Sequence, residues 1–313
     1  MSAQKWVRSS LRTLSTRLQE AGHAVSAPTV GRLLRELGYA LHVNTKQVEG
    51  RSQHPDREAQ FAYLTQQRQV FREAGLPVIS VDTKKKELIG NFKNAGQAWG
   101  LEPAAVNVHD FLSDAAGRAV PYGIYDLPHN RGTVYVGASG DTAQFAVDAI
   151  AQWWQTQGRA AFAPADQVLI LADGGGSNGY RARLWKEQIQ THLCDGLGLT
   201  VTVCHYPTGC SKWNPIEHRL FGPISVNWAG APLRTLDTLP AYIRGTRTAT
   251  GLAVHAEPLN GEYPTGQRIS DATMKALHVT AHATCPAWNY TITPRSPDAT
   301  DSAVLPPNQE VIL

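Results

Sequence analysis

Three acidic residues stand at the ends of predicted secondary-structure elements, where a side chain can be held rigidly at the edge of a sheet. Asp82 lies near the end of the apolar run PVISVDT, and Asp173 ends the run VLILAD. Glu217 lies in the first turn of a helix predicted for NPIEHRLFGPISVNW, directly after the apolar run LTVTVCHY. If the strand with Asp82 is central and neighbours the strand with Asp173, both aspartates emerge at one edge, where the Glu217 helix also begins. The pattern therefore predicts that the three carboxylates converge.

Converging carboxylates are costly unless cations occupy the site between them. Carboxylate oxygens are preferred ligands of Mg²⁺, and two such ions roughly 3.5–4 Å apart can grip the attacking and leaving oxygens of a phosphodiester. We therefore expect Asp82, Asp173 and Glu217 to be catalytic metal ligands that hold two Mg²⁺ ions, with Mn²⁺ able to substitute.

Taken alone, each carboxylate has a structural explanation. Asp82 could cap a turn before a lysine run, and Asp173 could be a turn residue ahead of three glycines. Glu217 could form a capping arrangement with Asn214 in the sequence NPIE, with Pro215 at the first helical position. The combination of two strand ends and one helix start, on a fold of suitable order, favours the catalytic interpretation.

The glycines after Asp173 also fit a nucleotide-binding loop. Gly174, Gly176 and Gly179 satisfy the pattern G-x-G-x-x-G between a strand and a helix. In such a unit the next strand ends in an acidic residue that binds the ribose hydroxyls, yet LTVTVCHY ends in a histidine and a tyrosine. An aspartate before the first glycine would also repel a pyrophosphate. A nicotinamide-dependent enzyme thus stays the less favoured alternative.

The elements that must position these residues predict an α/β fold. Alternating and apolar runs indicate strands at 77–83, 86–92, 119–127, 132–138, 168–173 and 199–206. Helical patterns fall at 141–158, 180–193 and 214–228. Strands followed by alternating helices and strands are typical of a mixed sheet flanked by helices.

The first 50 residues differ from the rest in charge. They contain seven Lys or Arg and three Glu, a net charge of +4, whereas the remaining 263 residues contain 22 basic and 23 acidic groups and carry −1. A small basic module ahead of a nearly neutral body indicates an anionic partner, and DNA is the usual one.

Two short helices are predicted in this module. Gly22 and Gly38 provide stop signals, and Ser26 is a candidate N-cap. A helical hairpin with Arg32 and Arg35 on its polar side predicts a helix-turn-helix that contacts DNA, although such hairpins also occur in proteins that never bind it. The apolar stripes of the two helices are Val7, Leu11, Leu14 and Leu18, then Val30, Leu33, Leu34 and Leu37.

Four segments follow from these patterns. We expect a helix-turn-helix module at 1–42, a linker and helix at 43–74, a catalytic domain at 75–295 and a loose tail at 296–313. No run of eighteen apolar residues and no cleavable signal sequence is present, so we expect no membrane partner and a cytoplasmic location. The four cysteines form no C-x-x-C pair and are interpreted as reduced thiols, with a structural zinc as a remote alternative.

Several longer motifs carry a family resemblance. VISVDTKKKELIGNFKN, VHDF, PYGIYDL, LADGGGSNGYRARLWK and TVCHYPTGCSKWNPIEHRLFGPISVNW, with HPDREAQFAYL before them and WNYTI after them, resemble the Rhodopirellula-type DDE transposases of bacterial insertion sequences. The resemblance runs from the helix-turn-helix region to about Ile292. It implies an RNase H-like core preceded by a small all-α module, with Asp82, Asp173 and Glu217 as the DDE triad.

The same resemblance implies an activity and its partners. An insertion-sequence transposase cuts double-stranded DNA at the terminal repeats of its element and transfers the freed 3′-hydroxyl to target DNA. We expect Mg²⁺ as cofactor, a homodimer or larger assembly on DNA, and a nucleoid-associated protein. A nuclease of the same fold without strand transfer and an inactive, element-derived DNA-binding protein are the alternatives.

The resemblance also gives roles to residues near the triad. DNA contacts are expected from the loops around the carboxylates, and two histidines are expected behind them. A solvated charge run, a helix N-cap, a buried tryptophan and structural histidines are the corresponding alternatives. The expected DNA contacts are Lys84, Lys85, Lys86, Ser177, Asn178, Lys212 and Trp213, and the supporting histidines are His205 and His218.

Overall fold

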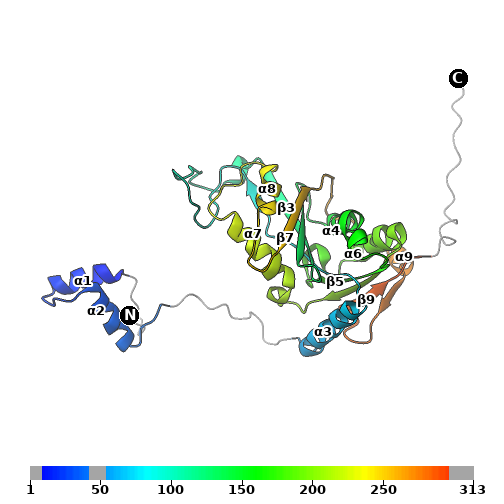
Figure 1. Cartoon of the computed structure of the whole chain (residues 1–313), viewed down its shortest axis with the longest axis horizontal. Coiled ribbons are helices and arrows are strands. Elements are labelled where there is room, and N and C mark those ends of the chain that lie inside the picture. The colour runs from blue at the N-terminus through cyan, green and yellow to red at the C-terminus, as the bar shows by residue number, and fades with distance from the viewer. Residues whose placement is uncertain (1–8, 42–53, 296–313) are drawn as a thin grey trace, which may run out of the picture. The chain divides into compact units, whose positions relative to one another are not determined.

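The computed structural model describes residues 9–41 and 54–295 (Figure 1). Contacts divide the chain into two units, Met1–Arg51 and Ser52–Leu313, called here the smaller and the larger unit. The helix expected between linker and catalytic domain therefore belongs to the larger unit. Val7, linker residues 43–53 and the tail 296–313 lie outside the described residues. Every helix within the described residues is too short or too polar to cross a membrane.

The smaller unit contains the two predicted helices, α1 (Leu11–Glu20) and α2 (Ala27–Glu36). Each begins at a serine whose hydroxyl accepts a backbone N–H: Thr13 donates to Ser10 at 3.1 Å, and Thr29 donates to Ser26 at 3.4 Å. Gly22 and Gly38 follow the two helices with φ values of 88° and 82°, which glycine adopts without strain. The predicted start of α2 at Ser26 and the predicted stops of both helices thus agree with the structure, whereas the N-cap of α1 at Ser10 was not predicted.

The larger unit is built on one mixed sheet with the order β7-β4-β3-β1-β5-β6-β9-β8, and β2 pairs with β3 off this path. The central strand β1 is antiparallel to β3 and parallel to β5, and β5 is parallel to β6. The strands are β1 (Val78–Thr83), β2 (Glu87–Ile89), β3 (Gly117–Asp126), β4 (Arg131–Gly137), β5 (Gln167–Ala172), β6 (Thr200–His205), β7 (Ala253–Pro258), β8 (Val279–Ala281) and β9 (Asn289–Ile292). This order and these directions confirm the predicted RNase H-like α/β fold.

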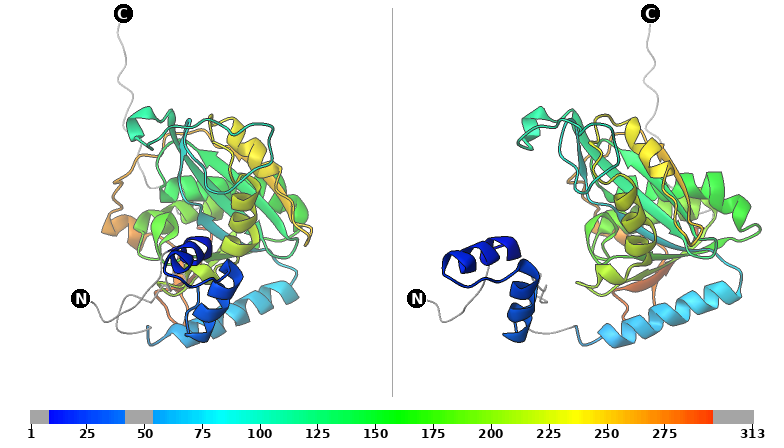
Figure 2. Two further views of the ribbon diagram at one scale, coloured as in Figure 1. Left: turned by 90° about the vertical axis from the view of Figure 1, so that its left-hand side faces the viewer. Right: turned by 60° about the vertical axis from the view of Figure 1, so that its left-hand side comes forward.

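Helices cover both faces of the sheet (Figure 2). They are α3 (Arg57–Glu73), α4 (Ala143–Trp153), α5 (Arg159–Ala161), α6 (Arg183–Gln188), α7 (Gly222–Asn227), α8 (Thr238–Arg244) and α9 (Asp271–Lys275). The π-helical segments are η2 (Trp154–Gly158), η4 (Ile189–Asp195) and η6 (Glu217–Phe221), and short 3-10 turns are η1 (Leu112–Asp114), η3 (Gly176–Asn178) and η5 (Ser211–Trp213). Residues 215–227, which include η6 and α7, form one helical stretch, called here the Glu217 helix.

Side-chain alternation along β1 assigns these helices to the two faces. Ile79 and Val81 point into the core shared with α4 and α6. Val78, from the alternate set, packs with Leu64 and Phe71 of α3 on the other face. The Glu217 helix and α8 bury a third apolar cluster against β3, β4 and β7. The strand β1 therefore lies between helices that pack on the two faces of the sheet.

A glycine allows the Glu217 helix to approach the sheet closely. A Cβ atom at Gly123 of β3 would lie 2.5 Å from the ring of Phe221 and 2.9 Å from a methyl carbon of Ile216. Gly123 is also the residue paired with Asp82 across β1 and β3. The position of Glu217 relative to Asp82 therefore depends on the missing side chain at residue 123.

We expect Gly123→Ala to lower the free energy of unfolding by about 1–3 kcal/mol, because the added methyl group overpacks a rigid ring. Urea unfolding followed by circular dichroism measures this. Gly117→Ala on the same strand is the matched control, since a Cβ there meets no atom within 4 Å. Equal stability of the two variants would contradict the close-packing argument.

Candidate active site

The register of the sheet brings the two aspartates together. Val81 pairs with Ala172 across the parallel strands β1 and β5. Asp82 and Asp173 each follow one of these paired residues, so they leave neighbouring strands at the same edge. Val81 and Ala172 point into the core under α4, and alternation directs Asp82 to the opposite face, where the Glu217 helix packs.

Glu217 lies in the first turn of its helix, as predicted, but the turn is π-helical. Its backbone N–H donates to the carbonyl oxygen of Asn214 at 3.1 Å. In a reciprocal cap the Asn214 N–H would donate to the Glu217 carboxylate. Among the described residues that N–H instead donates to the Ser211 carbonyl at 2.8 Å, so the cap suggested by NPIE does not form. The carboxylate of Glu217 is left available for another role at a π-helical turn, a feature frequent at functional sites.

Electrostatic coupling links the three carboxylates. Burial raises the pKa of Asp82 to about 8, and repulsion by Asp173, Glu217 and Asp141 adds to the rise, while the 2.7 Å bond from the Thr83 N–H opposes it. Burial likewise raises the pKa of Asp173 to about 6, with Glu217 adding to the rise. Each aspartate is thus destabilised in its charged form by its neighbours.

This donor set fits hard divalent cations. Partly buried carboxylate oxygens that repel one another are what a bound Mg²⁺ would neutralise. Within residues 9–41 and 54–295, no three His, Cys, Asp or Glu side chains are arranged to hold a single metal ion. The three carboxylates therefore do not form one closed shell.

Asn214 joins the parts that carry the three carboxylates. Its buried side-chain amide donates to Asp173 Oδ1 at 3.1 Å and to the Val81 carbonyl at 3.3 Å. Its Oδ1 accepts from the Ser80 hydroxyl, which in turn accepts the Ile216 N–H at 3.1 Å. One side chain thus fixes the end of β1, the carboxylate of Asp173 and the start of the Glu217 helix.

His205 supports Asp173 from behind. Its pKa is lowered to about 4, chiefly by complete burial, so the ring is neutral. Trp185 Nε1 donates to the Tyr290 hydroxyl at 3.0 Å, and that hydroxyl in turn donates to His205 Nε2 at 3.1 Å. The remaining N–H, on Nδ1, then donates to the Asp173 carbonyl at 2.9 Å. This chain of bonds supports the backbone of Asp173, in line with the expected supporting place of His205.

His218 does not occupy the expected place behind the carboxylates. It is exposed, and its Nε2 bonds the carbonyl oxygen of Lys212. This contact closes the turn before the Glu217 helix, which is the structural alternative considered for a histidine in this position.

The three lysines after Asp82 differ from one another. Lys84 is buried, pairs with Glu87 at 2.8 Å and lies 4.4 Å from the ring centre of Trp228, so it is not available to a DNA phosphate. This corrects the expectation for Lys84, because a run of three lysines in sequence alternates between the core and the surface. Lys85 and Lys86 are exposed.

A hollow of about 370 Å³ lies beside Asp82 and is lined by Lys85, Lys86, Ser177 and Asp141. Ser177 Oγ lies 3.3 Å from the hydroxyl oxygen of Thr83, at the wall of this hollow. Lys86 pairs with Asp141 at 3.2 Å. The hollow therefore presents cations and a hydroxyl directly beside the carboxylates.

The other expected DNA contacts lie in different surroundings. Asn178 is buried and accepts the Tyr122 hydroxyl at 3.0 Å, so it supports the glycine loop and is not available to a phosphate. Trp213 is 53% exposed and packs edge-on against Phe61 of α3, with the Lys212 ammonium 5.3 Å from its ring centre. The buried alternative for Trp213 is therefore wrong.

Arg32 and Arg35 lie in the smaller unit and are both exposed on α2. Arg32 forms an ion pair with Glu36 one turn later. An exposed ion pair of this kind is weak and competes poorly with a phosphate. Both residues thus lie on a solvent-facing surface of the hairpin.

Sequence reasoning missed two residues of the site. Asp141 accepts the Thr83 hydroxyl at 2.9 Å and raises the pKa of Asp82, although it precedes α4 and follows no strand directly. Asn214 was considered only as a cap. The sequence NPIE nevertheless indicates this role, because an asparagine side chain that is not needed as a cap can donate a hydrogen bond to a carboxylate.

An RNase H-like sheet with two aspartates at one edge and a glutamate on the adjoining helix is the arrangement of DDE enzymes. The chain belongs to the family described as the Rhodopirellula transposase DDE domain, whose model matches residues 1–294. This family consists of DDE transposases, enzymes of metal-dependent DNA phosphoryl transfer. No curated protein sequence matches the chain.

Solved structures with some likeness are complexes of the Mos1 transposase. The Mos1 strand transfer complex has a TM-score of 0.46 at 14% identity, covering 75% of this chain and 65% of that chain. The mariner Mos1 paired end complex with Mn has a TM-score of 0.45 at 14% identity, with 75% and 66% covered. The chain thus spans just under two thirds of the Mos1 chain. At these values the fold assignment rests on the strand order and the family match.

We expect Asp82→Asn to stabilise the metal-free protein. The pKa of Asp82 in the folded protein, about 8, lies above its ordinary value of 3.8. The contribution of Asp82 to folding stability is therefore complete below pH 3.8 and is lost as the pH rises to about 8. Asparagine keeps the Thr83 bond without this loss. In urea unfolding with EDTA, the variant should exceed the wild type by on the order of 2 kcal/mol at about pH 8 and by less at about pH 5.

Asp110→Asn, which changes an exposed carboxylate, is the control and should shift neither value. Added Mg²⁺ should reduce the advantage of Asp82→Asn, since the cation stabilises only the charged site. An advantage that did not depend on pH would contradict the electrostatic interpretation.

Proposed function

We propose that this chain is an insertion-sequence transposase that cuts DNA at the ends of its element and transfers the 3′-hydroxyl to target DNA, with Mg²⁺ as cofactor. The observation that carries the proposal is the meeting of Asp82, Asp173 and Glu217 at one sheet edge, with the pKa values of both aspartates raised. A cluster of this kind does not stabilise the structure, because its ionised carboxylates repel one another in the folded protein.

Asp82, Asp173 and Glu217 would hold the metal ions. When bound, two divalent ions acidify a nucleophilic hydroxyl and neutralise charge on the scissile phosphate. Asn214 holds the Asp173 carboxylate in place, and neutral His205 holds its backbone. The same residues would first serve hydrolysis by water at the element end and then attack by the 3′-hydroxyl, without a covalent protein intermediate.

Cations around this edge would hold the DNA. Lys85 and Lys86 lie beside Asp82 and would contact backbone phosphates, which fixes position without reading sequence. Lys212 and the exposed ring of Trp213 would contact DNA next to the cut, the ring by stacking on an unpaired base.

Arg32 and Arg35 of the smaller unit would add affinity for the terminal repeats. Because an insertion element has two ends, and each cut end must reach the same target, we propose that at least two copies of the chain act together on DNA.

Glu217→Gln tests the catalytic assignment. The variant keeps the backbone bond to Asn214, so it should stay folded and bind DNA normally. Because a charged metal ligand is lost, cleavage of duplex DNA carrying the chromosomal flanks of the gene should fall by orders of magnitude in Mg²⁺.

Glu262→Gln, at an exposed residue of the larger unit, is the matched control and should cut at the wild-type rate. Cleavage is to be followed with Mg²⁺ and with Mn²⁺, and joining of the cut ends to a plasmid is scored separately. Near wild-type cutting by Glu217→Gln would overturn the triad, and cutting without joining would indicate a nuclease.

Removing the smaller unit should separate affinity from chemistry. A chain that begins at residue 52 keeps every element of the larger unit. It should bind DNA more weakly and with a shallower salt dependence, because the 51 residues removed carry eight Lys or Arg and three Glu, a net charge of +5. Metal-dependent hydrolysis of non-specific duplex should persist. Unchanged affinity, measured by fluorescence anisotropy, would mean that the basic helices serve another surface.

A further inference from the structure

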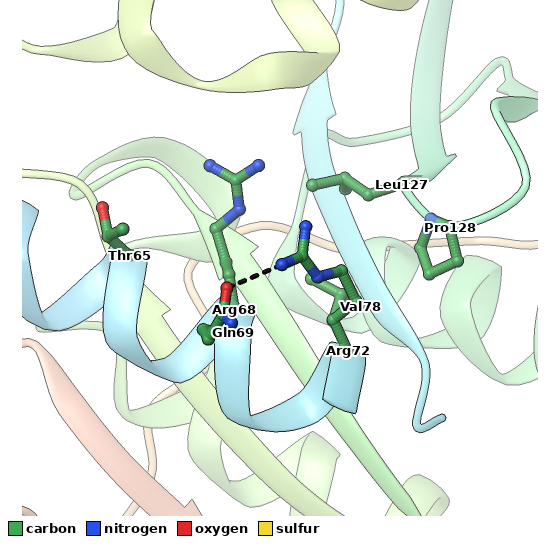
Figure 3. Close-up of a pocket in the computed structure, with 7 residues that line it drawn as sticks. All are labelled: Thr65, Arg68, Gln69, Arg72, Val78, Leu127 and Pro128. Atoms are coloured by element: carbon green, nitrogen blue, oxygen red, sulfur yellow. Dashed lines mark hydrogen bonds between the residues drawn. The ribbon is translucent and has the colours of Figure 1, made fainter. Parts of the chain in front are cut away.

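The helix α3 presents two arginines beside a hollow that the triad does not use. Arg68 and Arg72 lie one turn apart and are both exposed. Together with Thr65 and Gln69 of the same helix they line a hollow of about 330 Å³, whose far wall is formed by Leu127 and Pro128 (Figure 3). A space of this size between a helix and a strand turn can admit a phosphate group and its adjoining sugar.

The two guanidinium groups are arranged for a shared ligand. Figure 3 shows both side chains rising from the same side of α3, with Arg72 directed toward Leu127. Arg72 donates to Gln69 Oε1 at 2.7 Å, and the Gln69 amide donates to Glu73. The only acid of this helical turn is therefore occupied by a glutamine amide.

Charge balance sets this pair apart from the other arginine of α3. Arg57 forms an ion pair with Glu58 and lies over the ring of Phe61. Within the part of the chain that the structure describes, neither Arg68 nor Arg72 forms an ion pair with a carboxylate. Two like charges kept one turn apart, without acids, repel each other and favour an anionic ligand.

The hollow lies at the end of the sheet where β1 begins, and the triad lies at the end where β1 finishes. Helix α3 runs from one to the other. Near its start, Phe61 packs against Trp213, at the edge where the triad lies. Near its end, Arg72 lines the hollow with Val78, the first residue of β1, and Leu127, which follows β3. Arg72 is eleven residues beyond Phe61, which corresponds to a rise of about 16 Å along a helix.

We propose that Arg68 and Arg72 form a binding site for the phosphodiester backbone of duplex DNA, so that α3 guides the duplex away from the active site. The proposal rests on the proposed function, since it extends the DNA path of the same enzyme. About 16 Å corresponds to roughly five base pairs of B-DNA, so one duplex reaches the stacking surface of Trp213 and the Arg68/Arg72 site together. Contacts with phosphates alone make the site independent of base sequence.

The test is the salt dependence of DNA binding by the full-length chain carrying Arg68→Ala and Arg72→Ala. The probe is a fluorescently labelled duplex of random sequence in the presence of EDTA, so that no cleavage occurs. Loss of two phosphate contacts should lower the slope of log affinity against log salt by about 1.8. Between 50 and 200 mM salt, the variant should therefore lose about twelvefold less affinity than the wild type.

Two further variants separate a binding role from a structural one. Arg159→Ala with Arg268→Ala removes the same charge from two exposed residues and should leave the slope unchanged. Arg159 is the first residue of α5, and Arg268 follows Gln267, which bonds Gln144 of α4. Arg68→Lys with Arg72→Lys keeps the charge and should keep most of the slope.

An unchanged slope in the alanine variant overturns the inference, and so does an equal loss in the Arg159/Arg268 variant. Failure of the wild-type chain to bind DNA at all would overturn the proposed function instead. A slope lost in the alanine variant and kept in the lysine variant supports the site.

Discussion

Repulsion between carboxylates at the ends of two adjacent parallel strands is the constraint on which the rest of the larger unit depends. Asp82 and Asp173 follow paired residues of β1 and β5, so the backbone ladder itself keeps them side by side. Burial and proximity then raise both pKa values, which means that the ionised site opposes folding. The hydrophobic layers on both faces of the sheet must offset this cost, because within the described part of the chain neither Asp82 nor Asp173 forms an ion pair, and the nearby Lys84 and Lys86 pair with other acids.

Neutral polar groups, rather than cations, hold the carboxylates in position. The Asn214 amide and the neutral His205 ring each donate to Asp173 without adding charge. A lysine or arginine in either place would pair with the aspartate and compete with a metal ion for it. Gly123 also positions a carboxylate without adding charge, since its missing side chain lets the Glu217 helix pack close to Asp82. The site is thus rigid and yet keeps its negative charge for cations from solution.

The sequence predicted the central elements because their signals are local. Apolar runs that end near Asp82 and at Asp173 marked β1 and β5, and glycines marked the C-terminal ends of the smaller unit's two helices. The edge strands β7 and β8 escaped prediction, because such exposed strands have no continuous apolar run. The inner strand β9 escaped because its four residues are too few to show a pattern, although most of them are buried. The burial of Lys84 was not predictable from a lysine run, since it depends on Glu87 and Trp228, and Trp228 is distant in sequence. Asp141 escaped because only the fold brings it to Asp82.

In the proposed function a negatively charged site acts on a negatively charged polymer, and this separates binding from chemistry in the molecule. The larger unit, Ser52–Leu313, contains 21 basic and 23 acidic groups and carries a net charge of −2, so as a whole it offers little attraction to DNA. Attraction has to come from cations that lie outside the carboxylate cluster, because a cation inside it would displace the metal. Three groups of cations lie outside the carboxylate cluster. They are Lys85 and Lys86 beside it, the basic residues of the smaller unit, and Arg68 and Arg72 near the C-terminal end of α3. A duplex held at several such points would approach the carboxylates without any one contact being strong, and the bound metal ions would supply the positive charge that the site itself lacks.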